Sequence, residues 1–129
     1  MPTTGTMGDT MTFKRSCCPI TNALDILGDK WTLLVIRDLV LGKRCYQEFM
    51  SSPEQIASNI LADRLKQLEA SGLVTRRAYQ QKPARYEYVL TKKGMGLEPV
   101  LETLVVWGQK HFPGTMVFPR VKRARAYEH

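Results

Sequence analysis

Apolar residues recur at helical spacing in the first half of the chain, and the spacing predicts three short helices. The first begins near Pro19, because a proline costs little in the first turn of a helix, and it ends at Gly28. The second runs from about Lys30 to Leu41 and is apolar on almost every side, which is typical of a central buried helix. The third spans about Tyr46 to Ser51.

A fourth helix is predicted from Ser58 to Ala70, and only a narrow stripe of it is apolar. The stripe consists of Leu61, Leu65 and Leu68. These leucines fall within about 60° of one another when each residue turns the helix by about 100°. Ser58 is expected to cap the N-terminus, and Gly72 is well placed to end the helix in the left-handed conformation. We therefore expect this helix to be buried along its back and open along its front.

Two short strands of alternating polarity follow the fourth helix. They are predicted at Leu73–Tyr79 and Arg85–Leu90, with the sequence QQKPA as the turn between them. Alternation in the returning strand places Tyr86, Tyr88 and Leu90 on one side. The same alternation places Arg85, Glu87 and Val89 on the other side. The pattern predicts a β-hairpin.

The last long segment, Lys92 to Phe112, is predicted to form one helix whose start is weakened by Gly94 and Gly96. Its apolar residues spread over an arc too wide for one small domain to cover, so we expect the helix to pack in a dimer interface. The alternative is that it only caps its own core. Trp31 and Trp107 are expected to be core aromatics rather than walls of a ligand pocket.

This order of elements predicts a mainly α fold with a small β-hairpin. The arrangement is that of a winged helix-turn-helix followed by a dimerising C-terminal helix. The 129 residues are enough for about one domain. We expect a flexible N-terminal arm at 1–16, a DNA-binding and dimerisation domain at 17–113, and a basic C-terminal tail at 114–129. The tail is expected to be poorly ordered and to serve solubility more than DNA binding.

The charge distribution favours a polyanionic partner. The chain carries 19 Lys and Arg against 12 Asp and Glu, a net charge of +7. Much of the excess lies between Gln55 and Lys93, on the fourth helix and the hairpin. A run of charge is often only a solvated face. An open-fronted helix followed by a basic hairpin nevertheless suits a DNA duplex, with the helix in the major groove and the hairpin on phosphates.

The predicted DNA contacts come from the fourth helix and the hairpin. On the helix the candidates are Ser58, Asn59, Ala62, Asp63, Arg64, Lys66 and Gln67. The competing interpretation is an ordinary exposed helix surface. Asp63 repels phosphate unless it accepts from a cytosine amino group or pairs with Lys66, and Arg64 reaches either the DNA backbone or an internal acid. In the hairpin, Lys82 and Arg85 are favoured, because alternation sends Arg76 and Arg77 to opposite sides.

The sequence offers little chemistry for catalysis or metal binding. Its cysteines are odd in number, no CxxC pair occurs and only two histidines are present, so no disulfide, metal or cofactor is expected. No catalytic constellation or phosphate-binding loop is recognisable, so an enzyme is not predicted. The chain shows no secretory signal and no run of about 18 apolar residues. We expect a cytoplasmic protein that does not enter a membrane.

Three stretches of the sequence resemble the HxlR-type transcriptional regulators, relatives of the MarR-like repressors. They are CPITNALDILGDKWTLLVIRDLVLGKRCYQEF, IASNILADRLKQLEASGLV and PARYEYVLTKKG. The resemblance covers about Cys18 to Phe112 and implies a homodimeric DNA-binding regulator. It implies that Ser58–Ala70 is the recognition helix, that Arg76–Arg85 is the wing, and that the first and last helices build the dimer. The expected interface residues are Ile20, Leu24, Val100, Leu104, Trp107 and His111.

The resemblance also implies a thiol sensor, since some family members respond to electrophiles or oxidants through a cysteine beside the first helix. That position corresponds to Cys18, but the adjacent Cys17 and the third thiol, Cys45, leave the assignment open. The alternative for Cys18 is a small buried residue in the dimer interface. Taken together, the sequence predicts a homodimeric transcriptional repressor that binds double-stranded DNA and responds to oxidants, electrophiles or a small-molecule effector. The alternative is a winged-helix module that binds proteins.

Overall fold

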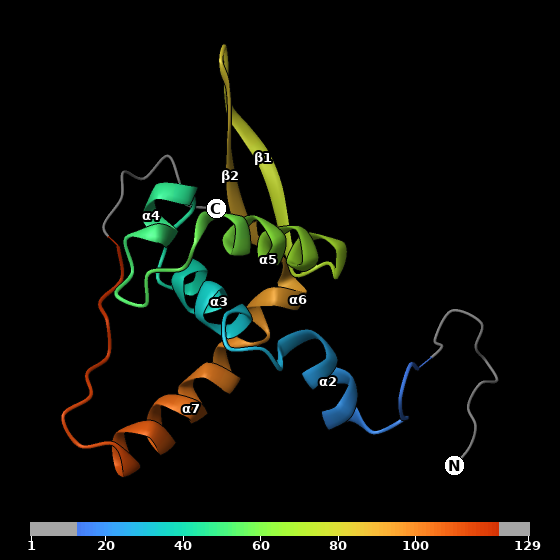
Figure 1. Cartoon of the computed structure of the whole chain (residues 1–129), viewed down its shortest axis with the longest axis vertical. Helices are drawn as coiled ribbons and strands as arrows, with labels where there is room; N and C mark the ends of the chain where they lie inside the picture. The colour runs from blue at the N-terminus through green and yellow to red at the C-terminus, as the bar shows by residue number, and fades with distance from the viewer. Residues whose placement is uncertain (1–12, 122–129) are drawn as a thin grey trace.

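The computed structural model describes residues 13–121, so residues 1–12 of the expected arm and 122–129 of the expected tail lie outside the described residues. The elements before the hairpin are α2 (Pro19–Leu27), α3 (Thr32–Val40), α4 (Tyr46–Met50) and α5 (Ser58–Ala70). The hairpin consists of β1 (Val74–Gln81) and β2 (Ala84–Leu90), and it is followed by α6 (Lys92–Met95) and α7 (Glu98–His111). This is the expected mainly helical fold with one antiparallel hairpin (Figure 1).

The core lies where α3, α4, α5 and the base of the hairpin meet. Its fully buried side chains are Ile36, Phe49, Leu61, Leu65, Leu68 and Val74. The three leucines of α5 are the predicted apolar stripe, and each is at most 1% exposed. Because truncating a buried leucine to alanine costs about 2–5 kcal/mol, this stripe alone fixes α5 firmly on the domain.

The N-cap of helix α5 lies one residue before the residue that the sequence indicated. The carbonyl of Ala57 accepts the first helical bond, from the N–H of Leu61 at 2.9 Å, so Ala57 is the N-cap and Ser58 is the first helical residue. The expected capping role of Ser58 is therefore wrong, and no side chain caps this end. At the other end Gly72 adopts φ 77°, as predicted, and the N–H of Leu73 donates to the carbonyl of Leu68.

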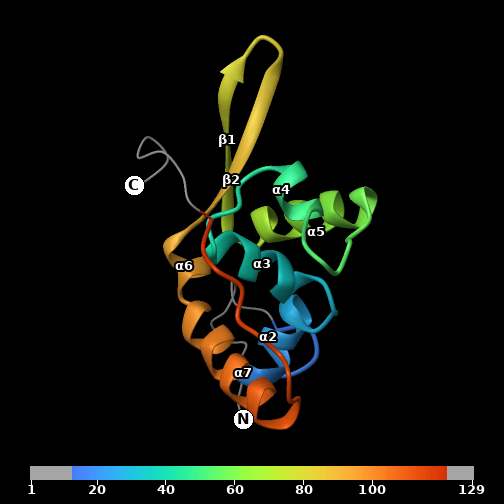
Figure 2. The ribbon, with the colours of Figure 1, turned by 90° about the vertical axis from the view of Figure 1, so that its left-hand side faces the viewer.

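The hairpin is longer and its turn tighter than the sequence pattern predicted. Gln81 pairs with Ala84, so the turn is only Lys82–Pro83 and not the five residues expected. The base of the hairpin is anchored where the N–H of Tyr88 donates to the carbonyl of Arg44 at 2.8 Å. Tyr88 is buried and Tyr86, farther along the same face, is exposed, because the outer half projects beyond the helices (Figure 2).

The expected single helix from Lys92 to Phe112 is wrong, because the chain forms two. The hydroxyl of Thr91 accepts from the N–H of Gly94 and caps the one-turn helix α6, and Pro99 lies in the first turn of α7, where its missing N–H is harmless. A side chain at Gly94 would place its Cβ only 2.2 Å from the carbonyl oxygen of Leu73. The glycine is therefore what lets α6 pack against the start of the hairpin.

Residues 115–121, here named the C-terminal strap, are extended along α3 (Figure 2). The N–H of Val121 donates to the carbonyl of Leu41 at 2.7 Å, the Arg120 guanidinium donates to the carbonyl of Val40, and Phe118 lies under the Arg37 guanidinium. The expectation of a poorly ordered tail is therefore wrong for these residues. At the other end of the chain, Arg15 pairs with Asp25 of α2 at 2.7 Å.

Candidate nucleic-acid interface

The front of α5 is open to solvent, as the sequence predicted. Ser58, Asn59, Ala62, Asp63, Lys66 and Gln67 are all exposed, whereas Arg64 is half-buried. Helix α5 and the hairpin both lie on the side of α3 opposite α7 (Figures 1 and 2). The structure therefore brings the helix candidates and the hairpin candidates to one part of the molecule.

Arg64 and Asp63 are engaged within the protein. The Nε of Arg64 donates to the Oδ2 of Asp29 at 2.8 Å, which is the internal pairing that the sequence had left open. The Oδ2 of Asp63 accepts from Arg64 and, at 2.9 Å, from the Nε2 of Gln67. The suggested Asp63–Lys66 pair is absent from the ion pairs of residues 13–121, because nearer donors take the carboxylate.

Asp29 joins the two central helices of this site. Its carboxylate accepts from the backbone N–H groups of Trp31 and Thr32 and from the Thr32 hydroxyl, which fixes the first turn of α3. Partial burial opposes ionisation, but the bonds from Thr32, Arg64 and Trp31 outweigh it and lower the pKa of Asp29 to about 2. Sequence reasoning missed this residue, although an aspartate directly before a predicted helix is a capping signal.

A second polar cluster holds the turn between α4 and α5. The Ser52 hydroxyl donates to the buried carboxylate of Asp38 at 2.7 Å and accepts from the Lys43 ammonium at 2.6 Å. Arg37 donates to Asp38 and makes two bonds of 2.9 Å to the carboxylate of Glu54. The position of α5 is thus set by polar contacts as well as by its leucines.

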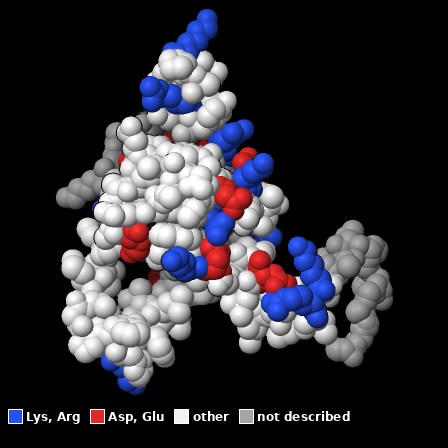
Figure 3. Space-filling view, in the orientation of Figure 1, with Lys and Arg blue, Asp and Glu red and all other residues white. Residues whose placement is uncertain are grey.

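The hairpin carries cations of two kinds. Arg76 stacks on the ring of Tyr86, 4.5 Å from its centroid, and Arg77 pairs with the buried carboxylate of Glu87 at 2.7 Å. Lys82 and Arg85 form no ion pair within residues 13–121, and the same holds for Lys66 on α5. Figure 3 shows basic side chains on the hairpin and at its tip. The unpaired cations are those available for phosphate.

The expected dimer residues form exposed apolar surface on α2 and α7. Ile20 is 70% exposed and Trp107 is 57% exposed, and Leu24, Val100, Leu104 and His111 are exposed as well. The Trp107 ring packs on His111, with centroids 4.8 Å apart. The expectation that Trp107 is a core aromatic is therefore wrong within one chain, while Trp31 does pack against the core. These residues lie at the end of the molecule away from the hairpin (Figure 1).

Cys18 precedes α2 and is half-buried at its N-terminus. The backbone N–H and hydroxyl of Thr21, followed by the N–H of Ile20, favour the thiolate and lower the pKa of Cys18 below its ordinary value. Cys17 is exposed beside it, and Cys45 lies at the start of α4. No disulfide links the three thiols in the described structure.

An open-fronted helix on a three-helix core, followed by a cationic hairpin, defines the winged helix-turn-helix class of DNA-binding proteins. The comparison with known families agrees, since the model of the HxlR-like helix-turn-helix domain matches residues 26–116. The chain belongs to this family and is a DNA-binding transcriptional regulator. Within residues 13–121 no helix is long and apolar enough to cross a bilayer. The same residues contain no cluster of three or more metal-ligating side chains.

Individual relatives support the same assignment. The HTH-type transcriptional regulator YdeP of Bacillus subtilis (strain 168) is 37% identical over 94 residues, which is 73% of each protein. The oxidised form of the redox regulator HypR is 35% identical with a TM-score of 0.67, over 73% of this chain and 97% of that one. The reduced form of YodB from B. subtilis is 29% identical with a TM-score of 0.63, over 78% of this chain and 100% of that one.

Proposed function

We propose that the protein is a homodimeric repressor that reads a near-palindromic operator with two copies of α5. The observation that carries this proposal is the front of α5, which is polar and exposed while its back is fixed by three buried leucines. Asn59, Ala62, Lys66 and Gln67 then face base edges or the DNA backbone, with Ser58 at the helix N-terminus near a phosphate. In this proposal Arg64 orients α5 through its bond to Asp29, and Asp63 orients the side chain of Gln67. Their main role is this orientation and not a contact with DNA.

The wing supplies the phosphate contacts in this proposal. Lys82 lies at the tip of the hairpin and Arg85 one residue into β2, and neither is engaged by an acid of residues 13–121. Arg77 is already neutralised by Glu87, and Arg76 is stacked on Tyr86. Lys82 and Arg85 are therefore the better candidates, as strand alternation had indicated.

Dimerisation is proposed through α2 and α7. The support is the exposed apolar surface of Ile20, Leu24, Val100, Leu104 and Trp107, with His111 beside Trp107, which a monomer would leave in water. Residues 17–113 would then form the DNA-binding and dimerisation domain, with the arm before it and the basic segment after it. A two-fold axis would place the two α5 helices in successive major grooves, about 34 Å apart.

We further propose that Cys18 makes the repressor sensitive to oxidants or electrophiles. Helix-terminal N–H groups stabilise its thiolate, the nucleophilic form, and two structural neighbours are described by their redox state. Reaction at Cys18, beside the proposed dimer helix α2, would disturb the spacing of the two DNA-binding helices. Cys17 is the second candidate because it is exposed and adjacent.

Protection footprinting of the DNA that flanks the protein's own gene tests the proposal. The expected result is a pair of protected half-sites, with transcription in vitro reduced while the protein is bound. Treatment with a thiol oxidant is expected to remove the protection. No protection together with weak salt dependence would instead favour a protein-interaction module. A regulator of this kind needs no catalytic step and acts in the cytoplasm with the DNA.

A further inference from the structure

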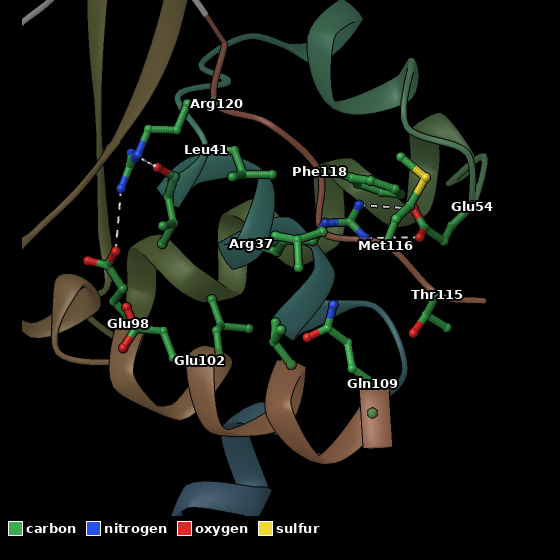
Figure 4. A pocket seen from close by; sticks show the side chains of 15 residues that line it. Arg37, Leu41, Glu54, Glu98, Glu102, Gln109, Thr115, Met116, Phe118 and Arg120 are labelled. Atoms are coloured by element: carbon green, nitrogen blue, oxygen red, sulfur yellow. Dashed lines mark hydrogen bonds and ion pairs between the residues drawn. The ribbon is translucent and has the colours of Figure 1, made fainter. Parts of the chain in front are cut away.

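A cavity of about 420 Å³ lies between α3, α7 and the C-terminal strap, outside the DNA-binding surface. Its volume is in the range of small-molecule sites, about 300–1,000 Å³. The middle is apolar, with Leu41, Leu101, Val105 and Phe118 among its walls (Figure 4). The strap therefore does more than pack on α3, because it closes one side of a small-molecule-sized space.

The charges around this cavity do not balance. Two cations, Arg37 and Arg120, line it together with three carboxylates, Glu54, Glu98 and Glu102, so the lining carries a net charge of −1. Arg37 is bound by Glu54, and Arg120 lies between the carbonyl of Val40 and Glu98. Glu102 makes no hydrogen bond or ion pair with any residue of 13–121. One uncompensated carboxylate thus belongs to the lining of this space, at a residue that is itself exposed to solvent.

Gly108 is a separate indication that the space is kept open. It lies in the interior of α7 and lines the cavity, where a glycine weakens the helix relative to alanine. An added Cβ would meet no atom within 4 Å, and the residue does not need a positive φ. Neither the backbone nor the packing of the described chain requires a glycine here, and its effect is to leave room at the cavity wall.

Helix α7 separates this cavity from the proposed dimer surface. Leu101, Val105 and Gly108 face the cavity, whereas Val100, Leu104 and Trp107 belong to the dimer surface. At about 100° per residue the two groups are centred about 100° apart around the helix. A second protomer on the dimer surface would therefore leave the cavity accessible.

We propose that this cavity is an effector site for an apolar monocation, an amine with an aromatic or aliphatic body. The apolar walls take the body and the Glu102 carboxylate takes the ammonium. An anion is disfavoured because both arginines are already engaged. The same cavity reaches the DNA-binding part through Arg37, whose partner Glu54 belongs to the loop that leads into α5.

Calorimetry on the full chain without DNA tests the site with three probes that share one body: 4-phenylbutylamine, 4-phenylbutanol and 4-phenylbutyrate. The amine is expected to bind about fivefold more tightly than the alcohol, the upper range for an ion pair open to water, and the carboxylate is expected to bind most weakly. The preference should shrink as salt is raised. Equal binding of the three probes, or no binding of the amine at its solubility limit, overturns the proposal.

Two variants locate the binding. Glu102→Gln should abolish the preference for the amine and leave the alcohol unchanged, whereas Glu69→Gln, which removes an exposed carboxylate of α5 far from the cavity, should change neither. Val105→Phe should weaken all three probes by filling the space. If Val105→Phe leaves amine binding intact while circular dichroism shows a native fold, the amine binds elsewhere and the assignment is wrong.

The effector role, unlike the site, rests on the proposed function. Saturation with 4-phenylbutylamine is expected to change operator affinity by at least about fivefold, as the weaker allosteric couplings do. If calorimetry shows binding but operator affinity does not change, the binding site is supported and the effector role is wrong. Loss of DNA binding in every condition would instead remove the proposed function, since the calorimetry contains no DNA.

Discussion

The Nε of Arg64 lies 2.8 Å from the Oδ2 of Asp29, so the proposed recognition helix is fastened by an ion pair to the first turn of α3. The same carboxylate caps α3 through the N–H groups of Trp31 and Thr32. One side chain thus sets the angle between two helices of the helix-turn-helix. We therefore propose that Arg64, which a sequence scan of an exposed basic helix would assign to DNA, is a positioning residue.

Asp29→Asn should lower the free energy of unfolding by about 1 kcal/mol at neutral pH, a figure discounted for the solvent access of this pair. The folded pKa of Asp29 is about 2, below its ordinary 3.8. Its contribution is therefore complete above about pH 4 and is lost as the pH falls toward 2. Urea unfolding of both proteins between neutral pH and pH 2 should show curves that converge on acidification. Asp25→Asn is the control, and parallel curves would contradict the assignment.

Lys82→Ala should weaken DNA binding on every sequence alike and reduce the slope of log affinity against log salt by about one, as for one lost phosphate contact. Fluorescence anisotropy across a salt series measures both quantities. Lys110→Ala, which removes a cation from the last turn of α7, is the matched control. An unchanged slope for Lys82→Ala would show that Lys82 does not contact phosphate.

Asn59→Ala should act differently, because a side chain in the major groove reads bases. We expect a loss of about 1–3 kcal/mol on the operator and almost none on unrelated DNA. Competition titrations with both DNAs separate the two effects. An equal loss on both would assign Asn59 to the DNA backbone instead.

Cys18→Ser should bind the operator as the parent does in reducing buffer and remain bound when a thiol oxidant is added. Serine keeps the size and hydrogen bonding of the side chain but supplies no thiolate. Cys17→Ser and Cys45→Ser, tested in the same gel-shift assay, are expected to release DNA normally. If Cys18→Ser also releases normally, the sensing thiol is another one.

Trp107→Ala should raise the dimer dissociation constant by at least about thirtyfold, because a large exposed aromatic at the centre of an interface contributes about 2 kcal/mol or more. Sedimentation equilibrium of the two proteins measures this directly. Val106→Ala, at a neighbouring position that is 67% exposed but on another face of α7, should have little effect. A parent protein that is monomeric at high concentration would rule out the α2–α7 dimer.

The spacing of apolar residues along the chain correctly predicted the elements that such local spacing determines. Helix α5 begins and ends at the residues expected, Ser58 and Ala70, because a leucine stripe and a terminal glycine encode it within 15 residues. The sequence predicted a turn wider than the observed one, since Gln81 and Ala84 pair across a turn of only two residues. The break between α6 and α7 was missed because Thr91 and Pro99 act as a cap and a new start inside one apolar pattern.

Contacts between distant parts of the chain could not be predicted from local periodicity. Asp29 and Arg64 are 35 residues apart, and Arg120 lies 80 residues from the carbonyl of Val40 that it meets. Nothing in the composition of the segment after Pro113 indicates that it follows α3, because its backbone bonds depend on carbonyls left open at the end of that helix. The cavity beneath it is for the same reason invisible in the sequence.

The close approach of Gly94 to Leu73 also bears on how the wing and α7 are placed relative to each other. Even a methyl group at Gly94 would collide with a backbone oxygen, which cannot rotate away as a side chain can. Substitution there would force apart the start of β1 and helix α6, and with them the wing and the helix proposed to hold the dimer. A residue with a side chain at position 94 is therefore expected to change how the wing is placed relative to α7, an effect that reaches well beyond the single contact.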